Sequence, residues 1–159
     1  MSLKTARPDA KASNSLLQVI RFKLGDEEFA MDILQVEEII RMLEITKVPK
    51  APRFVEGVVS LRDRVIPVVD LRKRFDIAPA PENGQTRMIV VKTRPKPIGL
   101  IVDSVSEVLR LSKERVEPSP TVISNLDSRP IAGVAKIEGH LIMLLDADLI
   151  LSNQENTQI

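Results

Sequence analysis

The chain of 159 residues contains no cysteine, no tryptophan and no tyrosine, and its aromatic residues are four phenylalanines. The absence of cysteine excludes a disulfide framework, thiolate metal ligands and thiol catalysis, and it suits a reducing cytoplasm. Barrels that bind nucleic acid stack bases on aromatic side chains, and only Phe22, Phe29, Phe54 and Phe75 could serve here. Each of them lies in an apolar pattern that predicts a core position, so we expect no nucleic-acid partner.

An excess of one charge is also missing, because 22 aspartates and glutamates balance 23 lysines and arginines. A net charge of +1 supplies no basic field for a phosphate backbone. No apolar run approaches the roughly 20 residues that span a bilayer, and the polar start of the chain lacks the apolar segment of a secretory signal. We therefore expect a soluble cytoplasmic protein without direct membrane insertion, with flexible tails at residues 1–15 and 152–159.

A pattern of fifteen residues occurs twice in the chain, 76 positions apart and without a gap. It begins at Gly57 and Gly133 and continues through a polar turn and an apolar run to Asp70 and Asp146. Upstream, a second correspondence at an offset of 69 positions aligns residues 19–22 with their counterparts in the second half. Such repetition predicts that one small unit is built twice, and the seam between two packed units is a common place for a ligand or partner.

The segment 76–86 is the clearest connector, so the single domain at 16–151 divides into subdomains of about 16–75 and about 87–151. Each half has short apolar segments separated by glycine, proline and charged turns. This pattern predicts an all-β fold with short helices, built as small barrels or sandwiches. Asp70 and Asp146 each precede a short helical segment, where an aspartate accepts hydrogen bonds from free backbone N–H groups.

The same two aspartates could also form a catalytic pair, because two similar β halves that each contribute one aspartate are typical of aspartic proteases. That chemistry requires a small hydroxyl residue and a glycine after each aspartate, whereas Leu71 follows Asp70 and Ala147 follows Asp146. Two helix caps are therefore favoured. An aspartyl hydrolase remains one alternative, and a small-barrel nucleic-acid binder remains another.

His140 is the only histidine, and it lies in a predicted turn. Without a second histidine or a cysteine, neither a typical zinc site nor a nucleophilic triad can be assembled. The six glycines are isolated from one another and form no phosphate-binding loop. We expect no catalytic residue, no metal and no cofactor.

Charged residues beside aliphatic ones suggest a different kind of site. Glu37, Glu38 and Glu107 flank apolar positions, which indicates either a solvated strand edge or an apolar patch with a charged rim that meets a partner helix. Arg62 lies in a predicted hairpin turn and could be an ordinary turn residue or an interface anchor.

Taken in order, these segments resemble the CheW coupling protein family of bacterial chemotaxis. The similarity covers about residues 16–151 and rests on order and spacing rather than on any single segment. The matching segments lie at residues 22–29, 32–33, 36–39, 49–52, 55–62, 65–72, 75, 99–103, 105–108, 118–120, 131–134 and 144–146.

The resemblance implies two intertwined five-stranded SH3-like barrels that share a core, and it implies no catalysis. It also implies an adaptor that couples the histidine kinase CheA, through its regulatory domain, to the cytoplasmic tips of methyl-accepting chemoreceptors. Such a protein would be cytoplasmic and recruited to membrane-associated receptor arrays. The receptor- or partner-binding residues that the resemblance implies are Ile33, Val36, Glu38, Gly57, Arg62, Gly99, Val105 and Val108.

One hairpin departs from the family pattern. The family usually has Asn-Leu-Arg-Gly there, whereas this chain has Ser60-Leu-Arg-Asp63. Without the glycine, the turn is restricted to backbone angles that an aspartate tolerates.

Overall fold

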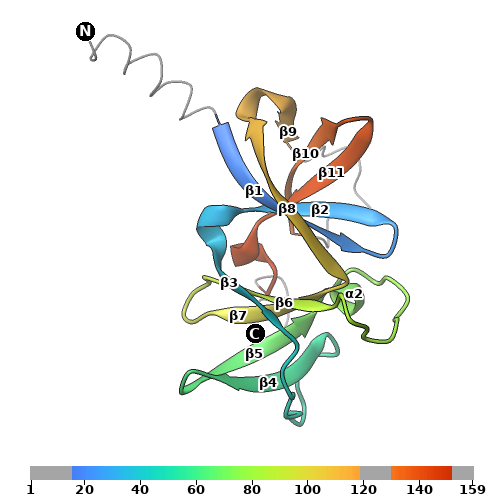
Figure 1. The fold of residues 1–159 in the computed structure, drawn as a ribbon. Coiled ribbons are helices and arrows are strands. Elements are labelled where there is room, and N and C mark those ends of the chain that lie inside the picture. The colour runs from blue at the N-terminus through green and yellow to red at the C-terminus, as the bar shows by residue number, and fades with distance from the viewer. Residues whose placement is uncertain (1–15, 119–129, 152–159) are drawn as a thin grey trace, which may run out of the picture.

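The computed structural model describes residues 16–118 and 130–151, and within these ranges the chain forms two β-sheets (Figure 1). The predicted tails at 1–15 and 152–159 lie outside the described residues. The six-stranded sheet has the order β8 (Ser104–Ser112), β1 (Leu16–Leu24), β2 (Glu27–Asp32), β11 (His140–Leu145), β10 (Ile131–Ile137) and β9 (Val116–Pro118). The five-stranded sheet has the order β3 (Val36–Arg41), β6 (Arg87–Val91), β7 (Ile98–Val102), β5 (Arg64–Asp70) and β4 (Val55–Leu61).

Short helical segments connect some of the strands. They are η1 (Ile33–Gln35), α2 (Leu71–Arg74), η2 (Lys113–Arg115) and η4 (Ala147–Leu149). The prediction of a mainly β protein with short helices is confirmed.

Each sheet takes strands from both sequence halves. The hairpin β1–β2 joins β8 and β11 of the second half, and the hairpin β6–β7 joins β3 and β5 of the first half. Both exchanges use a parallel pair, in which Ile142 lies level with Glu28 and Val68 lies level with Gly99. The two sheets therefore repeat one strand order with the halves interchanged, which agrees with intertwined units. The sheets do not coincide with the predicted subdomains of about 16–75 and 87–151, because each sheet contains strands of both. The division of the chain at the connector stays a prediction.

Each sheet curls toward closure because the chain after one edge strand crosses to the opposite edge. After β8 and η2, strand β9 pairs with β10. After β3, Thr46 makes an isolated antiparallel bridge with Val58 of β4, with N···O distances of 2.9 and 2.8 Å. The expected SH3-like barrels therefore hold approximately, with a short sixth strand in one sheet and a single bridge in the other.

The core is shared between the sheets. Phe22 and Phe29 of the six-stranded sheet stack at 5.7 Å between ring centroids, and Phe75 after α2 lies 5.3 Å from Phe29. All three rings are buried in one cluster with residues of β6 and β7. Phe54 is also buried, so none of the four phenylalanines is available to stack a base.

Two glycines at equivalent positions make the crossings possible. Gly57 has φ +149°, and a Cβ there would lie 2.1 Å from the carbonyl oxygen of Thr46. A Cβ at Gly133 would lie 2.9 Å from the carbonyl oxygen of Glu117. The nearest obstructing atoms at Gly57 are backbone, and at Gly133 the Val116 side chain lies at 2.7 Å in addition to the Glu117 carbonyl. The crossing segment would therefore have to move away from β4 or β10 to admit a side chain.

We predict that Gly57→Ala lowers the free energy of unfolding by about 3 kcal/mol, because it adds a backbone clash to a nearly glycine-only conformation. Urea unfolding followed by circular dichroism measures the change. Gly84→Ala is the matched control, since nothing lies within 4 Å of a Cβ at that position. Equal effects of the two substitutions would contradict the proposed crossing.

Candidate functional site

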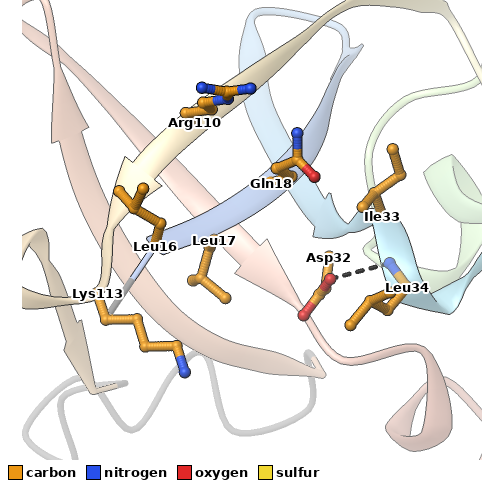
Figure 2. Close-up of a pocket in the computed structure, with 8 residues that line it drawn as sticks. All are labelled: Leu16, Leu17, Gln18, Asp32, Ile33, Leu34, Arg110 and Lys113. Atoms are coloured by element: carbon orange, nitrogen blue, oxygen red, sulfur yellow. Dashed lines mark hydrogen bonds between the residues drawn. The ribbon is translucent and has the colours of Figure 1, made fainter. Parts of the chain in front are cut away.

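An open groove of about 500 Å³ lies where β1 begins, β2 ends and β8 ends (Figure 2). Apolar side chains from β1 and η1 face one another across it, and two cationic side chains lie on the β8 side. The lining residues are Leu16, Leu17, Gln18, Asp32, Ile33, Leu34, Arg110 and Lys113.

The η1 turn forms one wall of the groove. The Asp32 carboxylate accepts a hydrogen bond of 2.9 Å from the Leu34 backbone N–H, which caps the turn (Figure 2). This turn leaves Leu34 76% exposed, while Ile33 is half-buried beside it. The Gln35 side chain holds the turn to η4, because its amide donates to Asp146 at 3.2 Å and its oxygen accepts from the Ala147 N–H at 3.3 Å. The apolar wall is thus fixed to the second half of the chain.

Strand β8 forms the other wall. Its side chains alternate near the groove, with Leu109 and Leu111 packed inward and Val108 and Arg110 turned outward. Val108 is 48% exposed and lies two residues before Arg110, so it extends this wall beyond the residues that line the hollow. Of the predicted site residues, Ile33 lines this groove, and Val108 lies on the outward face of β8 beside it.

Val36 and Val105 occupy equivalent places in the two repeats, but their surroundings differ. Both are half-buried and pack against the shared core. Val105 also lines a separate polar hollow of about 320 Å³ with Gln85, Arg87, Ser104 and Ser106. The structure does not bring Val105 into the groove of Ile33.

Glu38 and Arg62, predicted separately, form an ion pair between β3 and the β4–β5 turn. A second ion pair beside it joins Glu37 to Arg64, and the hydrogen bond from Arg64 lowers the pKa of the Glu37 carboxyl. The two turn residues Arg62 and Asp63 have φ values of 51° and 68°. Asp63 thus keeps the left-handed turn conformation that a glycine would adopt without strain.

Gly57 and Gly99, the two glycines among the predicted site residues, are buried rather than exposed. Gly57 receives the crossing segment at Thr46, as described above. A Cβ at Gly99 would lie 2.8 Å from the sulfur of Met88, within the five-stranded sheet. Both support packing in this structure, and a direct role in partner contact stays a prediction for each.

The two repeated aspartates are helix caps, as predicted. Asp70 accepts a 3.0 Å hydrogen bond from the Arg72 N–H, and Asp146 accepts one of 3.0 Å from the Asp148 N–H. Burial raises the pKa of Asp70, and the nearby Glu56 carboxylate adds to the increase. Because each carboxylate is engaged at its own helix, the aspartyl hydrolase alternative is not supported.

The residues that the structure describes form no evident metal-binding site. Within 16–118 and 130–151, no three histidine, cysteine, aspartate or glutamate side chains gather in a way that could hold a metal ion. The imidazole of His140 is largely exposed and lies 3.6 Å from the Glu28 carboxylate. None of the helices described here is long and apolar enough to cross a membrane.

Several groove residues were missed by sequence reasoning. Leu16 and Leu17 belong to an ordinary alternating strand pattern, and Arg110 and Lys113 are separated from them by about 90 positions in the sequence. They meet because β1 pairs with β8, which places Leu16 level with Ser112 and Gln18 level with Arg110. Leu34 is the groove residue that the sequence could have indicated. It follows Ile33 directly, and two adjacent apolar residues in an extended segment point to opposite faces, so one of them must face outward.

A second seam between the halves is held by a bidentate ion pair. Arg72 of α2 donates to the two carboxylate oxygens of Asp103 at 2.8 and 2.5 Å. The Gly25 N–H donates to the same carboxylate at 2.7 Å, and Arg72 also donates to the carbonyl of Ala78. This network joins the β1–β2 turn, α2, the connector and the end of β7. The Arg72 hydrogen bond lowers the pKa of Asp103.

A small all-β protein built from two intertwined barrels, with an open surface groove that combines apolar and charged side chains, fits a protein-docking scaffold. A family model described as the CheW-like domain matches residues 18–155. The chain belongs to the CheW-like family, and it is therefore an adaptor of the chemotaxis coupling type.

Known proteins agree with this assignment along most of the chain. The chemotaxis protein CheW of Rhizobium meliloti is 34% identical over 143 residues, which are 90% of this chain and 92% of that protein. The chemotaxis protein CheW of Thermotoga maritima is 36% identical over 134 residues, which are 84% and 87% of the two chains. The crystal structure of the scaffolding protein TtCheW from Thermoanaerobacter tengcongensis matches with a TM-score of 0.80 at 33% identity, covering 85% of this chain and 92% of that one.

We predict that Asp103→Asn lowers the free energy of unfolding by about 2 kcal/mol at neutral pH, because it breaks a charged, partly buried hydrogen-bond network. The pKa of Asp103 is lower in the folded chain than in the unfolded one, so this stabilisation is present above the unfolded pKa and is lost as the pH falls through the folded pKa. The difference between wild type and variant should therefore shrink on acidification from pH 7 to about pH 3.

Urea unfolding at a series of pH values measures this difference. Asp76→Asn is the control, because Asp76 is largely exposed and lies 3.6 Å from Arg53. A difference between wild type and Asp103→Asn that does not change with pH would contradict the account.

Proposed function

We propose that this chain couples a CheA-type histidine kinase, through the kinase's regulatory domain, to the cytoplasmic tip of a methyl-accepting chemoreceptor, without catalysis of its own. The single observation that carries the proposal is the groove, which presents exposed apolar side chains between two walls fixed to opposite halves of the chain. Membership of the CheW-like family supports the choice of partners. A protein that binds two partners at once raises their effective concentration without any new chemistry.

The receptor tip, a helical hairpin, is the partner that we assign to the groove. Helices that dock in grooves do so through apolar residues spaced along one face. Leu34 supplies exposed apolar surface in the groove, and Val108 supplies more on the outward face of β8 beside it. Arg110 and Lys113 supply positive charge at the rim. The groove therefore fits a helix whose apolar stripe is flanked by carboxylates.

Arg62 is the second contact that we assign to receptor coupling. Its side chain is 68% exposed even though it pairs with Glu38, so a guanidinium N–H remains accessible to a partner carboxylate. The kinase regulatory domain would bind outside the groove. Binding to the receptor tip would recruit the adaptor to membrane-associated receptor arrays.

We predict that Val108→Asp weakens binding to a receptor-tip fragment by at least about tenfold, because it places a carboxylate on the exposed apolar surface of β8 beside the groove. Co-purification of the chain with the receptor-tip fragment and, separately, with a kinase regulatory domain measures the effect. Kinase binding should be retained. Val48→Asp is the matched control, since Val48 is 42% exposed in the segment before β4 and away from the groove. Equal receptor binding by the two variants would contradict the groove as the receptor site.

We also predict that Arg62→Ala weakens receptor coupling severalfold and leaves the fold intact, because the exposed ion pair with Glu38 adds little stability. Receptor-stimulated kinase activity reports the coupling, and circular dichroism reports the fold. Normal stimulation by a folded Arg62→Ala protein would exclude this role.

A further inference from the structure

The connector between α2 and β6 contains an Asn83-Gly84 pair in an exposed turn (Figure 1). The turn covers residues 83–86 and leads directly into β6. The Asn83 carbonyl accepts a hydrogen bond of 3.2 Å from the Thr86 N–H, and the Asn83 N–H donates to the Thr86 hydroxyl at 2.9 Å. Thr86 is buried, so the turn is anchored at its far end while Asn83 and Gly84 stay exposed.

The side chain of Asn83 is folded back over this turn. Its oxygen Oδ1 accepts a hydrogen bond of 2.7 Å from the Gln85 N–H. An asparagine that bonds to the backbone two residues later lies along the intervening peptide, so its side-chain carbonyl carbon faces the Gly84 nitrogen. The hydrogen bond also draws electron density toward Oδ1, which makes that carbon more electrophilic.

The glycine leaves its own nitrogen open to reaction. Gly84 has no side chain to shield the nitrogen, and nothing lies within 4 Å of the position that a Cβ would take. The chain contains five asparagines, and Asn83 is the one that a glycine follows. The other four are followed by residues with side chains, namely Ser15, Leu126, Gln154 and Thr157.

A carboxylate at position 83 would have a cation beside it. The Arg87 guanidinium folds onto the same turn, where it donates to the carbonyl oxygens of Gly84 at 3.0 Å and Thr86 at 2.9 Å. Among the residues that the structure describes, no carboxylate forms an ion pair with Arg87. A negative charge formed on this turn is therefore stabilised by an arginine that is already in place.

We propose that Asn83 is a site of spontaneous deamidation in the folded protein, and that the carboxylate formed there pairs with Arg87. In the first step the Gly84 nitrogen forms a bond to Cγ of Asn83, while the Gln85 N–H stabilises the negative charge on Oδ1. The Cγ–Nδ2 bond then breaks. The amine leaves as ammonia, after taking up through water the proton that the Gly84 nitrogen releases, and a five-membered cyclic imide remains.

Water opens this imide at one of its two carbonyl carbons. Addition at Cγ breaks the newly formed C–N bond and restores the ordinary backbone, with an aspartate at position 83. Addition at the backbone carbonyl carbon breaks the original peptide bond and gives isoaspartate, in which the chain runs through the former side chain. Each route consumes one water, releases one ammonia and leaves one carboxylate, so no oxidant or reductant is needed.

The modification changes the surface at the start of β6 and leaves the groove unchanged. Gln85 and Arg87 line the polar hollow at the start of β8, and Arg87 is the one charged residue among those that line it. The groove lies at the other end of β8, beside Arg110 and Lys113. Pairing of Arg87 with a new carboxylate therefore neutralises the hollow. This change goes beyond receptor and kinase docking and depends on neither.

Mass spectrometry of the folded chain, incubated at about pH 8.5 and about 37 °C, tests the proposal. Within about two weeks most of the chain should gain about 1 Da, and peptide mapping should find aspartate and isoaspartate at position 83. The rate should rise with pH, because the attacking nitrogen must lose its proton. The other four asparagines serve as internal controls and should react at least about tenfold more slowly.

Gly84→Ala is the matched variant, because the position has room for a Cβ. It should slow the reaction at Asn83 at least about tenfold, since the added methyl group shields the nitrogen. The folded chain should deamidate at a rate within about fivefold of that of the chain unfolded in urea, because the turn already holds the amide against the attacking nitrogen.

Asn83→Asp tests the ion pair separately, because it supplies the carboxylate without the reaction. In a nuclear magnetic resonance titration, the new carboxyl should have a lower pKa in Asn83→Asp than in Asn83→Asp/Arg87→Gln, since an adjacent cation favours the charged form. Circular dichroism shows that both variants are folded.

Three results would overturn the modification site: no mass gain at position 83 during the incubation, an equal rate in Gly84→Ala, or a folded chain that reacts far more slowly than the unfolded one. Equal pKa values of the new carboxyl in the two aspartate variants would overturn the pairing with Arg87.

Discussion

The fold depends on the parallel pairing that places the hairpin of each half in the sheet of the other. β2 runs beside β11, and β7 runs beside β5, so neither sheet can form from one half of the chain. The buried cluster around Phe22, Phe29 and Phe75 is correspondingly built from both halves. Long-range pairing of this kind makes the protein one cooperative unit rather than two tethered barrels. The groove and the Arg72–Asp103 seam both lie where the exchanged hairpins meet the other half.

Duplication supplied the backbone, and divergence of side chains supplied the surfaces. Gly57 and Gly133 retain the same task of admitting a crossing segment, and Asp70 and Asp146 retain the same task of capping a short helix. These positions tolerate little change because backbone geometry sets them. Exposed positions are free of that constraint. At one seam between the halves, α2 is held by the Arg72–Asp103 ion pair. At the other seam, η4 is held by hydrogen bonds from the neutral side chain of Gln35, next to the η1 wall of the groove.

Features that depend on local chemistry could be predicted from the sequence. The helix caps, the hairpin turns and the buried phenylalanines follow from residue type and alternation, and the repeat predicted two related units. The exchange of hairpins could not be predicted from these patterns, because the apolar alternation of β2 is the same whether its neighbour is β5 or β11. The resemblance to the CheW family supplied the expectation of intertwined barrels.

The site was predicted less completely than the fold, for the same reason. Glu38 and Arg62 are 24 residues apart and lie toward opposite edges of the five-stranded sheet, so only its curvature brings them into contact. Leu16 and Lys113 share the groove because β1 pairs with β8 across the exchange. Val105 and Val36 hold equivalent positions in the repeat, although their surroundings differ. The repeat identifies equivalent backbone positions, and it does not identify equivalent surfaces.

The central claim is that one molecule binds a receptor tip and a kinase regulatory domain at the same time through separate surfaces. The most direct measurement is titration calorimetry of the receptor-tip fragment into the chain, with and without saturating kinase regulatory domain. The account predicts one receptor site in both titrations and formation of a ternary complex. Loss of receptor binding when the kinase domain is bound would show that the two partners compete for one surface and would contradict the account.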